Sequence, residues 1–162
     1  MVILRFVVLA AALVLPALPA AAADLSQMAP ADEYFGHARL SVLGIANTIR
    51  DAGARLDEGR PAQPLLDGPL AFANDAIRAW ETKFPNDPWI ARDLLALEVA
   101  YVHAGTPRGM DLARRTEAWL VQDYPGAPEA RDARVALRDG RGDGDGSPWE
   151  RFAAMRAPFP PQ

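Results

Sequence analysis

The chain contains no cysteine among its 162 residues. This absence excludes structural disulfides, thiol nucleophiles and cysteine-bound metal ions, and it fits a protein of any compartment. His37 and His103 are the two histidines, and neither has a cysteine or carboxylate partner in a metal-binding pattern. Glu33 lies four residues before His37, but at the charged start of an expected helix. We therefore expect no metal site.

Candidate nucleophiles are equally scarce. The serines, Ser26, Ser41 and Ser147, lack the flanking glycines of a nucleophile elbow. No glycine-rich loop follows a strand pattern, so a phosphate-binding loop is not expected. Acidic pairs such as Asp32 and Glu33 stand at helix starts, where carboxylates stabilise the helix dipole. We expect no enzymatic activity and no cofactor.

Long apolar runs are missing after the N-terminus. Phe6 to Leu15 is an unbroken apolar run, two prolines follow it, and small residues occupy 21–23. The run is short for a transmembrane helix, which needs about 20 residues. We predict a cleaved signal peptide over residues 1–23, with export to the periplasm or beyond the cell and no stable membrane insertion after cleavage. Retention of this segment as a membrane anchor is the alternative.

The charge balance is acidic. Cleavage would remove Arg5 alone among the charged residues, which leaves 16 basic and 21 acidic residues and a formal net charge of −5. Nucleic acids and anionic membrane surfaces repel such a chain, so neither is an expected partner.

The chain does contain a short internal repeat. Phe84, Pro85 and Pro88 recur forty residues later as Tyr124, Pro125 and Pro128. Trp80 likewise returns as Trp119, one residue out of phase. Repeats of this period are typical of helical-hairpin arrays, in which each unit buries its apolar face against its neighbours.

Apolar residues recur at steps of three and four throughout, which indicates helices and no strands. The first helix is expected over about Asp32–Arg50, with Leu40, Leu43 and Ala46 or Asn47 on its buried stripe. A long connection over 51–68 follows, with at most a short helical turn near 52–56. Further helices are expected from Pro69 with Asp67 or Gly68 as cap, from Pro88 under an Asp87 cap to Gly105, from Pro107 under a Thr106 cap, and over about Pro128–Arg138.

Two of these helices resemble a tetratricopeptide repeat. Leu94, Leu97, Tyr101 and Gly105 stand at the spacings of the family's first helix and turn, and Ala113, Leu120 and Pro125 match its second helix and closing proline. Leu40, Leu43 and Gly44 look like the first helix of a preceding unit. Glu98 departs from the pattern, because the family has a small residue there. The resemblance implies an all-α domain over 32–138: antiparallel hairpins stacked as a short right-handed superhelix with a closing helix.

In that family, partners bind a concave groove lined by the first helix of each unit. The resemblance places these positions on Ala38, Ser41, Ile45, Thr48, Arg92, Leu95, Val99 and Val102. Burial between packed helices is the other interpretation of the apolar ones. Arg92 is the one cation of the set, so the clamp that some members use for a terminal carboxylate is missing. A mainly apolar groove would accept an amphipathic helix or an extended segment.

The sequence therefore favours a non-catalytic scaffold or adaptor of the cell envelope that binds a protein or peptide. The alternative is a small-ligand-binding or enzymatic domain with its site between the first and third helices, where His37, Arg39 and Arg92 are the polar candidates. Residues 24–31 are expected to be a flexible N-terminus, and 139–162 a Gly-, Asp- and Pro-rich tail with a short helix. Trp149, Phe152 and Met155 of that helix could cover the groove.

Overall fold

A computed structural model describes residues 27–139 of the chain. The predicted signal peptide, nearly all of the predicted tail and the three apolar tail residues lie outside this range. Within it, the chain forms six helices and no strand, apart from an isolated bridge between Phe35 and Leu40. The all-α prediction is confirmed for this part of the chain.

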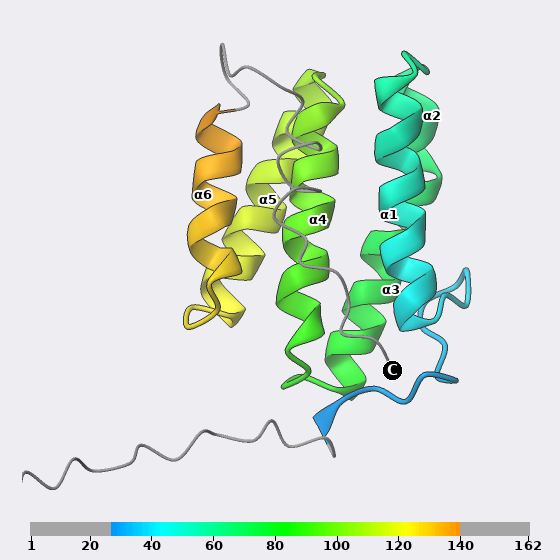
Figure 1. The fold of residues 1–162 in the computed structure, drawn as a ribbon, viewed down its shortest axis with the longest axis vertical. Helices are drawn as coiled ribbons and strands as arrows, with labels where there is room; N and C mark the ends of the chain where they lie inside the picture. Colours follow the sequence, from blue (N-terminus) through cyan, green and yellow to red (C-terminus); the bar gives the residue numbers. More distant parts are fainter. Residues whose placement is uncertain (1–26, 140–162) are drawn as a thin grey trace, which may run out of the picture.

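The helices form two layers, and one helix lies at the centre of the packing. They are α1 (Val42–Asp57), α2 (Ala62–Asp67), α3 (Pro69–Lys83), α4 (Trp89–His103), α5 (Pro107–Asp123) and α6 (Glu129–Asp139). Figure 1 shows α4 between α1 and α6, with α3 and α5 behind this layer. Because α4 packs against α1, α3, α5 and α6, twelve of its fifteen residues are buried.

The predicted bounds of the first helix are wrong at both ends. Residues 35–40 form a tight turn in which the backbones of Phe35 and Leu40 exchange hydrogen bonds of 2.8 and 3.0 Å. Gly36 and Arg39 have left-handed backbone angles there, with φ of 66° and 52°, which a helix does not allow. The helix begins only after Ser41, whose Oγ accepts a hydrogen bond of 3.1 Å from the N–H of Gly44.

Residues 51–68 were predicted as a connection, yet most of them are helical: α2 occupies Ala62–Asp67, and α1 itself continues beyond Arg50 to Asp57. Gly53 does not break it, because this glycine is buried against the rest of the core. The helix ends where Gly59 adopts a φ of 75° and the N–H of Arg60 bonds back to the carbonyl of Arg55 at 3.0 Å. This is the glycine-terminated ending that helices commonly use.

The shift of α1 also changes which face is buried. Leu43, expected on the core stripe, is 60% exposed, whereas Ile45, Ile49 and Ala52 are buried. Leu40 lies before the helix, in the turn. Its predicted role in the first helix of a repeat unit is therefore wrong.

The later boundaries agree with the sequence. Helix α3 starts at Pro69 after Gly68, and α5 starts at Pro107 after Thr106, whose side chain accepts from the N–H of Gly109 at 3.0 Å. Asp87 lies one residue before the N-cap of α4, yet its Oδ1 accepts from the N–H of Trp89 at 3.0 Å and so caps the helix.

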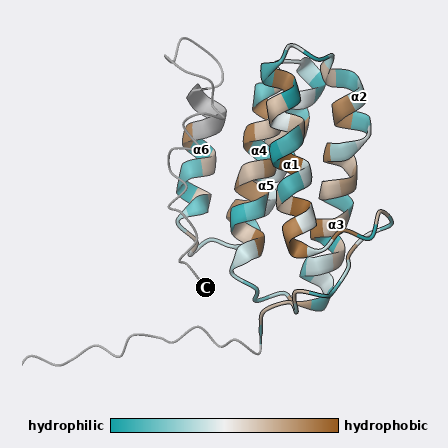
Figure 2. Cartoon of the chain, turned by 45° about the vertical axis from the view of Figure 1, so that its right-hand side comes forward, coloured by the Kyte–Doolittle hydropathy of each residue, from teal (hydrophilic) through white to brown (hydrophobic). Residues whose placement is uncertain are grey.

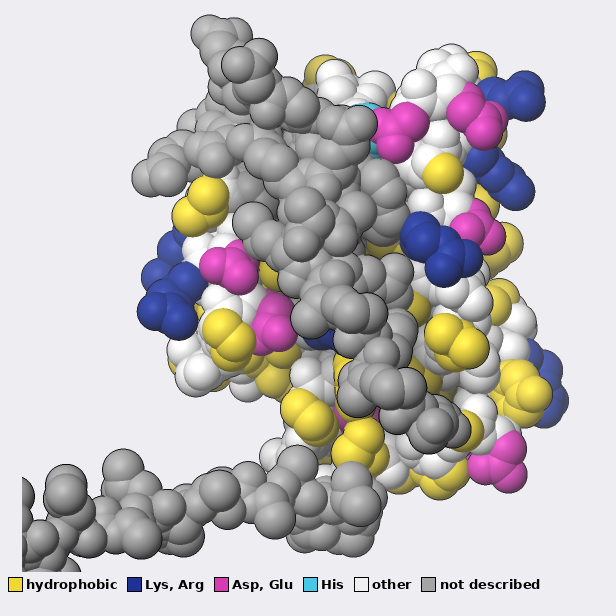
Figure 3. All heavy atoms as spheres, in the orientation of Figure 1, with side chains coloured by type: hydrophobic (Ala, Val, Ile, Leu, Met, Phe, Trp, Pro, Cys, Tyr) yellow, Lys and Arg dark blue, Asp and Glu magenta, His cyan; other side chains and the backbone are white. Residues whose placement is uncertain are grey.

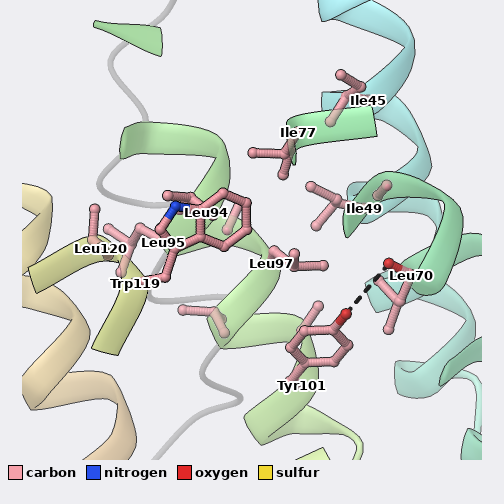
Figure 4. Close-up of a cluster of buried hydrophobic side chains, with 14 of the residues drawn as sticks. Ile45, Ile49, Leu70, Ile77, Leu94, Leu95, Leu97, Tyr101, Trp119 and Leu120 are labelled. Carbon is pink, nitrogen blue, oxygen red and sulfur yellow. Dashed lines mark hydrogen bonds between the residues drawn. The ribbon is translucent and has the colours of Figure 1, made fainter. Parts of the chain in front are cut away.

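The core is a continuous apolar cluster that extends from α1 to α6. Figure 4 shows Ile45 and Ile49 of α1, Ile77 of α3 and Leu97 of α4 converging on one another. Tyr101 also belongs to this cluster, and its hydroxyl donates to the backbone carbonyl of Leu70 at 3.3 Å. Figure 2 shows the hydrophobic colour concentrated along the inner helices.

Helix α6 is the last helix of the described chain and has one buried side. Ala130 and Ala133 are buried, while Arg131, Arg134 and Val135 on its other side are exposed. A helix with one solvent-exposed side is what the end of a stack requires. Within residues 27–139, none of the helices has the length and apolarity needed to cross a membrane.

Candidate functional site

A largely apolar surface hollow lies where the first turns of α1 and α4 meet the N-terminal segment. This α1/α4 pocket has a volume of about 340 Å³. Its apolar lining comes from Met28, Ala29 and Ala31, from Val42, Leu43 and Ala46, and from Trp89. Arg92 and Asp93 provide polar groups from α4. In Figure 3, hydrophobic side chains gather at the lower end of this face.

Asp87 holds the parts of this pocket together. Its side chain is 1% exposed, and its Oδ2 accepts hydrogen bonds from the Trp80 indole at 3.0 Å and from the N–H of Ala29 at 2.7 Å. Its Oδ1 accepts from the N–H of Trp89. One carboxylate therefore joins α3, the start of α4 and the N-terminal segment, and it fixes the walls of the pocket relative to one another.

Aromatic packing fixes the turn that precedes α1. Phe35 is buried, with its ring centroid 5.8 Å from that of Trp80 and 6.1 Å from that of Phe84. Such contacts stabilise beyond their buried area. A side chain at Gly36 would meet the backbone of Ala76 at 2.8 Å, so the turn lies directly against α3. The start of α1, and Leu43 with it, is thereby held in place.

The predicted groove residues do not share one surface. Ser41 and Arg92 both line the α1/α4 pocket, so the structure brings these two together. Thr48 is half-buried and its hydroxyl donates to the carbonyl of Gly44 at 2.8 Å. Buried in the core are Ile45, Leu95, Val99 and Val102, with exposures of 0, 6, 3 and 4%. Leu95, Val99 and Val102 are enclosed because α4 packs against α1, α3, α5 and α6, and Ile45 of α1 belongs to the same core cluster. Ala38 is exposed in the turn before α1.

Arg92 is half-buried, and its guanidinium carbon lies 4.9 Å from the centroid of the Trp89 ring. This distance is within the range of a cation–π interaction. The stacking orients Arg92 along the pocket wall, next to Asp93. Arg92 and Asp93 thus place polar groups at this edge of the pocket, beside the apolar surface.

The polar candidates of the alternative site do not converge. His37 lies in the turn before α1, and its Nδ1 is 2.9 Å from Asp75 Oδ2 on α3. Hydrogen bonds from the backbone N–H and then the ring of His37 hold the pKa of Asp75 below its ordinary value. Arg39 lies 6.0 Å above the Tyr34 ring. The lining of the α1/α4 pocket includes Arg92 but neither His37 nor Arg39.

No group of three or more potential ligands gathers as a metal site within residues 27–139. His103 lies at the end of α4, where its Nε2 is 3.0 Å from Asp57 Oδ1. This pair joins α4 to the end of α1, and it is distant in sequence from the residues of the pocket.

Glu98 is the most unusual ionisable group of the described chain. Its side chain is fully buried on α4, and neither carboxyl oxygen has a hydrogen-bond partner among residues 27–139. Burial, and to a lesser extent the negative charge of Glu117 on α5, raises its pKa to about 9. The carboxyl is therefore neutral at pH 7.

Sequence reasoning missed a second pocket, of about 270 Å³, between α3 and α5. Arg78, Arg108 and Arg115 line it, with Tyr101 and Trp119. Arg108 and Arg115 lie seven residues apart and so share one face of α5. That spacing was a signal in the sequence, but the contribution of α3 required the packing of the helices.

Together, these features define an all-α protein of packed antiparallel helices that carries a surface pocket between α1 and α4. No protein-family model, curated protein or solved structure matches the chain. Its functional interpretation therefore depends on the geometry of its own residues.

Proposed function

We propose that this chain is a non-catalytic scaffold or adaptor that binds a segment of another protein in the α1/α4 pocket. The observation that carries the proposal is the apolar surface of that pocket, in which Leu43 is 60% exposed. The predicted signal peptide places this activity in the periplasm or outside the cell.

The packing of the helices supports a stacked-hairpin architecture of the tetratricopeptide type. Helix α1 packs against α3 and α4, α3 packs against α4, and α4 in turn packs against α5 and α6. Each hairpin thus contacts the first helix of the next, which is the order of a helical-repeat array. We infer a short right-handed superhelix in which α6 is the closing helix and α1, α4 and α6 line the concave side.

The pocket has the size and chemistry to hold apolar side chains. A large exposed hydrophobic residue beside other apolar groups is a common feature of protein-binding surfaces. Burial of one leucine-sized side chain contributes about 1.5–3 kcal/mol, so two such side chains give useful affinity. The walls are positioned by Asp87 and Phe35 before any partner arrives, which reduces the entropy cost of binding.

The proposed occupant is an apolar segment of a partner protein, helical or extended, that places one or two large side chains against Leu43, Val42 and Trp89. Arg92 would then meet a carbonyl or carboxylate of the same segment at the edge of the pocket. This combination of apolar anchors and one polar contact is typical of peptide recognition by helical grooves.

Affinity capture with matched variants tests the proposal. Leu43→Glu places a charge in the pocket, and Phe72→Glu places one at a comparably exposed residue of α3, 50% exposed, that does not line it. We expect the wild-type chain and Phe72→Glu to retain the same partner from an envelope extract and Leu43→Glu to lose it. Equal capture by all three would contradict binding in this pocket. A small molecule that remains bound through purification and is lost in Leu43→Glu would favour the ligand-binding alternative.

A further inference from the structure

The α3/α5 pocket concentrates positive charge on a chain that is acidic overall. Three of the residues that line it are arginines, and none is Asp or Glu, while the whole chain carries a net charge of −4. By contrast, the α1/α4 pocket contains Asp87 and Asp93 beside its single arginine. The two pockets lie on different layers, since α3 and α5 are behind the layer of α1, α4 and α6 (Figure 1).

Arg78 is the most available of the three cations. Its guanidinium carbon lies 4.3 Å from the centroid of the Trp119 ring, and its Nε donates to Asn74 Oδ1 at 3.2 Å. It has no carboxylate partner among residues 27–139. Stacking on one side and a hydrogen bond at Nε hold the group in place while leaving both terminal nitrogens able to donate.

The other two arginines are paired with acids at the edge of the pocket. Arg108 forms an ion pair with Asp67, and Arg115 forms one with Asp111 four residues before it, at 2.8 Å. These pairs are exposed, so their attraction is weak and each guanidinium can still turn toward an anion. Asp67 and Asp111 themselves do not line the pocket.

The floor of the pocket is buried and neutral. The Tyr101 hydroxyl donates to Leu70, and the buried Thr116 hydroxyl donates to the carbonyl of Leu112 at 3.0 Å. Burial raises the pKa of Tyr101 to about 12, and the nearby charges of Arg78 and Arg108 oppose this rise. Neither hydroxyl carries a negative charge near neutral pH. The carboxylate of Glu81 accepts from the indole of Trp119, a lining residue, at 2.9 Å, but Glu81 does not itself line the pocket.

We infer that the α3/α5 pocket binds an oxyanion group, either a carboxylate or a phosphate, with Arg78 as the main contact and Arg108 and Arg115 beside it. A planar guanidinium donates two parallel hydrogen bonds to such groups, and this geometry suits both. The same chemistry could come from a small acid in solution or from an acidic group on a larger molecule. This site is independent of the proposed protein-binding pocket.

An NMR titration of the chain without the predicted signal peptide, at constant ionic strength, tests the inference. The probes are inorganic phosphate, acetate, and a short glycine peptide with a free C-terminus compared with its amide. We expect a saturable shift of the Arg78 Nε and Trp119 indole signals, with the Trp80 indole unchanged, because Trp80 bonds to Asp87 on another part of the molecule. Saturation by phosphate or acetate identifies a free anion as the ligand. Saturation by the peptide with a free C-terminus alone identifies an acidic group on a larger molecule.

Substitutions distinguish specific binding in this pocket from a general attraction of anions to positive charge. Arg78→Gln should weaken binding about tenfold or more, since a charged hydrogen bond contributes about 1.5–3 kcal/mol. Arg78→Lys keeps the positive charge but loses the two parallel hydrogen-bond donors of the guanidinium, so it should give an intermediate affinity. Arg50→Gln on α1, where Arg50 pairs with Asp51, is the matched control and should bind normally. Shifts that never saturate with any probe, or equal affinity in Arg78→Gln and wild type, would overturn the inference.

Discussion

Glu98 shows what a single residue can do to the stability of this domain. At this position of α4 a carboxyl is fully buried without a hydrogen-bond partner among the described residues. Its pKa of about 9 in the folded chain compares with an ordinary value of 4.5. Between these values the folded state binds the proton more tightly than the unfolded state, so stability must fall as pH rises.

We therefore expect the free energy of unfolding to decrease between pH 5 and pH 8, with Glu98 contributing at most about 1.4 kcal/mol per pH unit. Glu98→Gln removes the ionisation and should lose this slope, so that it is about 2–3 kcal/mol more stable than wild type near pH 7. The two proteins should approach each other at pH 4.5. Urea denaturation at several pH values measures the difference.

Glu117 is the charged neighbour that faces Glu98 from α5, and it provides the control. Because burial is the larger cause of the shift, Glu117→Gln should keep most of the slope. Parallel curves for wild type and Glu98→Gln would mean that Glu98 reaches water in solution.

At the scale of the elements, α1 shows why one helix was misplaced. The apolar pattern of residues 32–50 is compatible with a helix, but Gly36 and Arg39 are held in left-handed conformations by packing of the turn against α3. That packing is a tertiary effect, and the local sequence does not reveal it. Two helix starts that carry local signals were predicted to the residue, at Pro69 and Pro107, and the start of α4 was predicted one residue early.

Ser41→Ala tests the observed start of α1. Loss of an N-cap hydrogen bond costs about 1 kcal/mol of stability, and the Ser41 Oγ makes such a bond to Gly44. Thr106→Ala, which removes the corresponding cap of α5, should cost a similar amount. A thermal or urea unfolding curve measures both. If Ser41→Ala is neutral while Thr106→Ala is destabilising, the helix begins elsewhere.

The candidate site was predictable in part for the same reason. Ser41 and Arg92 were expected to share a surface and do line one pocket. Leu43 was expected in the core, yet it is exposed, because a helix that starts later presents a different face. Burial of Leu95 and Val99 depends on α6 and α5 covering α4, and helical periodicity alone does not show which of its faces are covered.

At the scale of the whole molecule, the array depends on each helix covering its neighbour. Helix α6 packs against both α4 and α5, and it contributes the fully buried Ala133. Ala133→Glu should destabilise the domain by about 3 kcal/mol or more, because it forces a charge or a large side chain into a filled space. Val135→Glu, at a residue of α6 that is 44% exposed, should change stability by less than about 0.5 kcal/mol.

Chemical denaturation of the two variants distinguishes a docked closing helix from a loosely attached one. A large effect at Ala133 alone means that α6 is part of the cooperative core. Equal, small effects at both positions would show that the array ends at α5.

The central claim is that the α1/α4 pocket receives a segment of a partner protein, and photo-crosslinking in the cell tests it most directly. A photoreactive amino acid replaces Leu43 in one chain and Phe72 in another, since both side chains are about half exposed or more and only Leu43 lines the pocket. We expect a defined crosslinked protein from position 43 that is missing from position 72. The same products from both positions, or none from position 43, would contradict the claim.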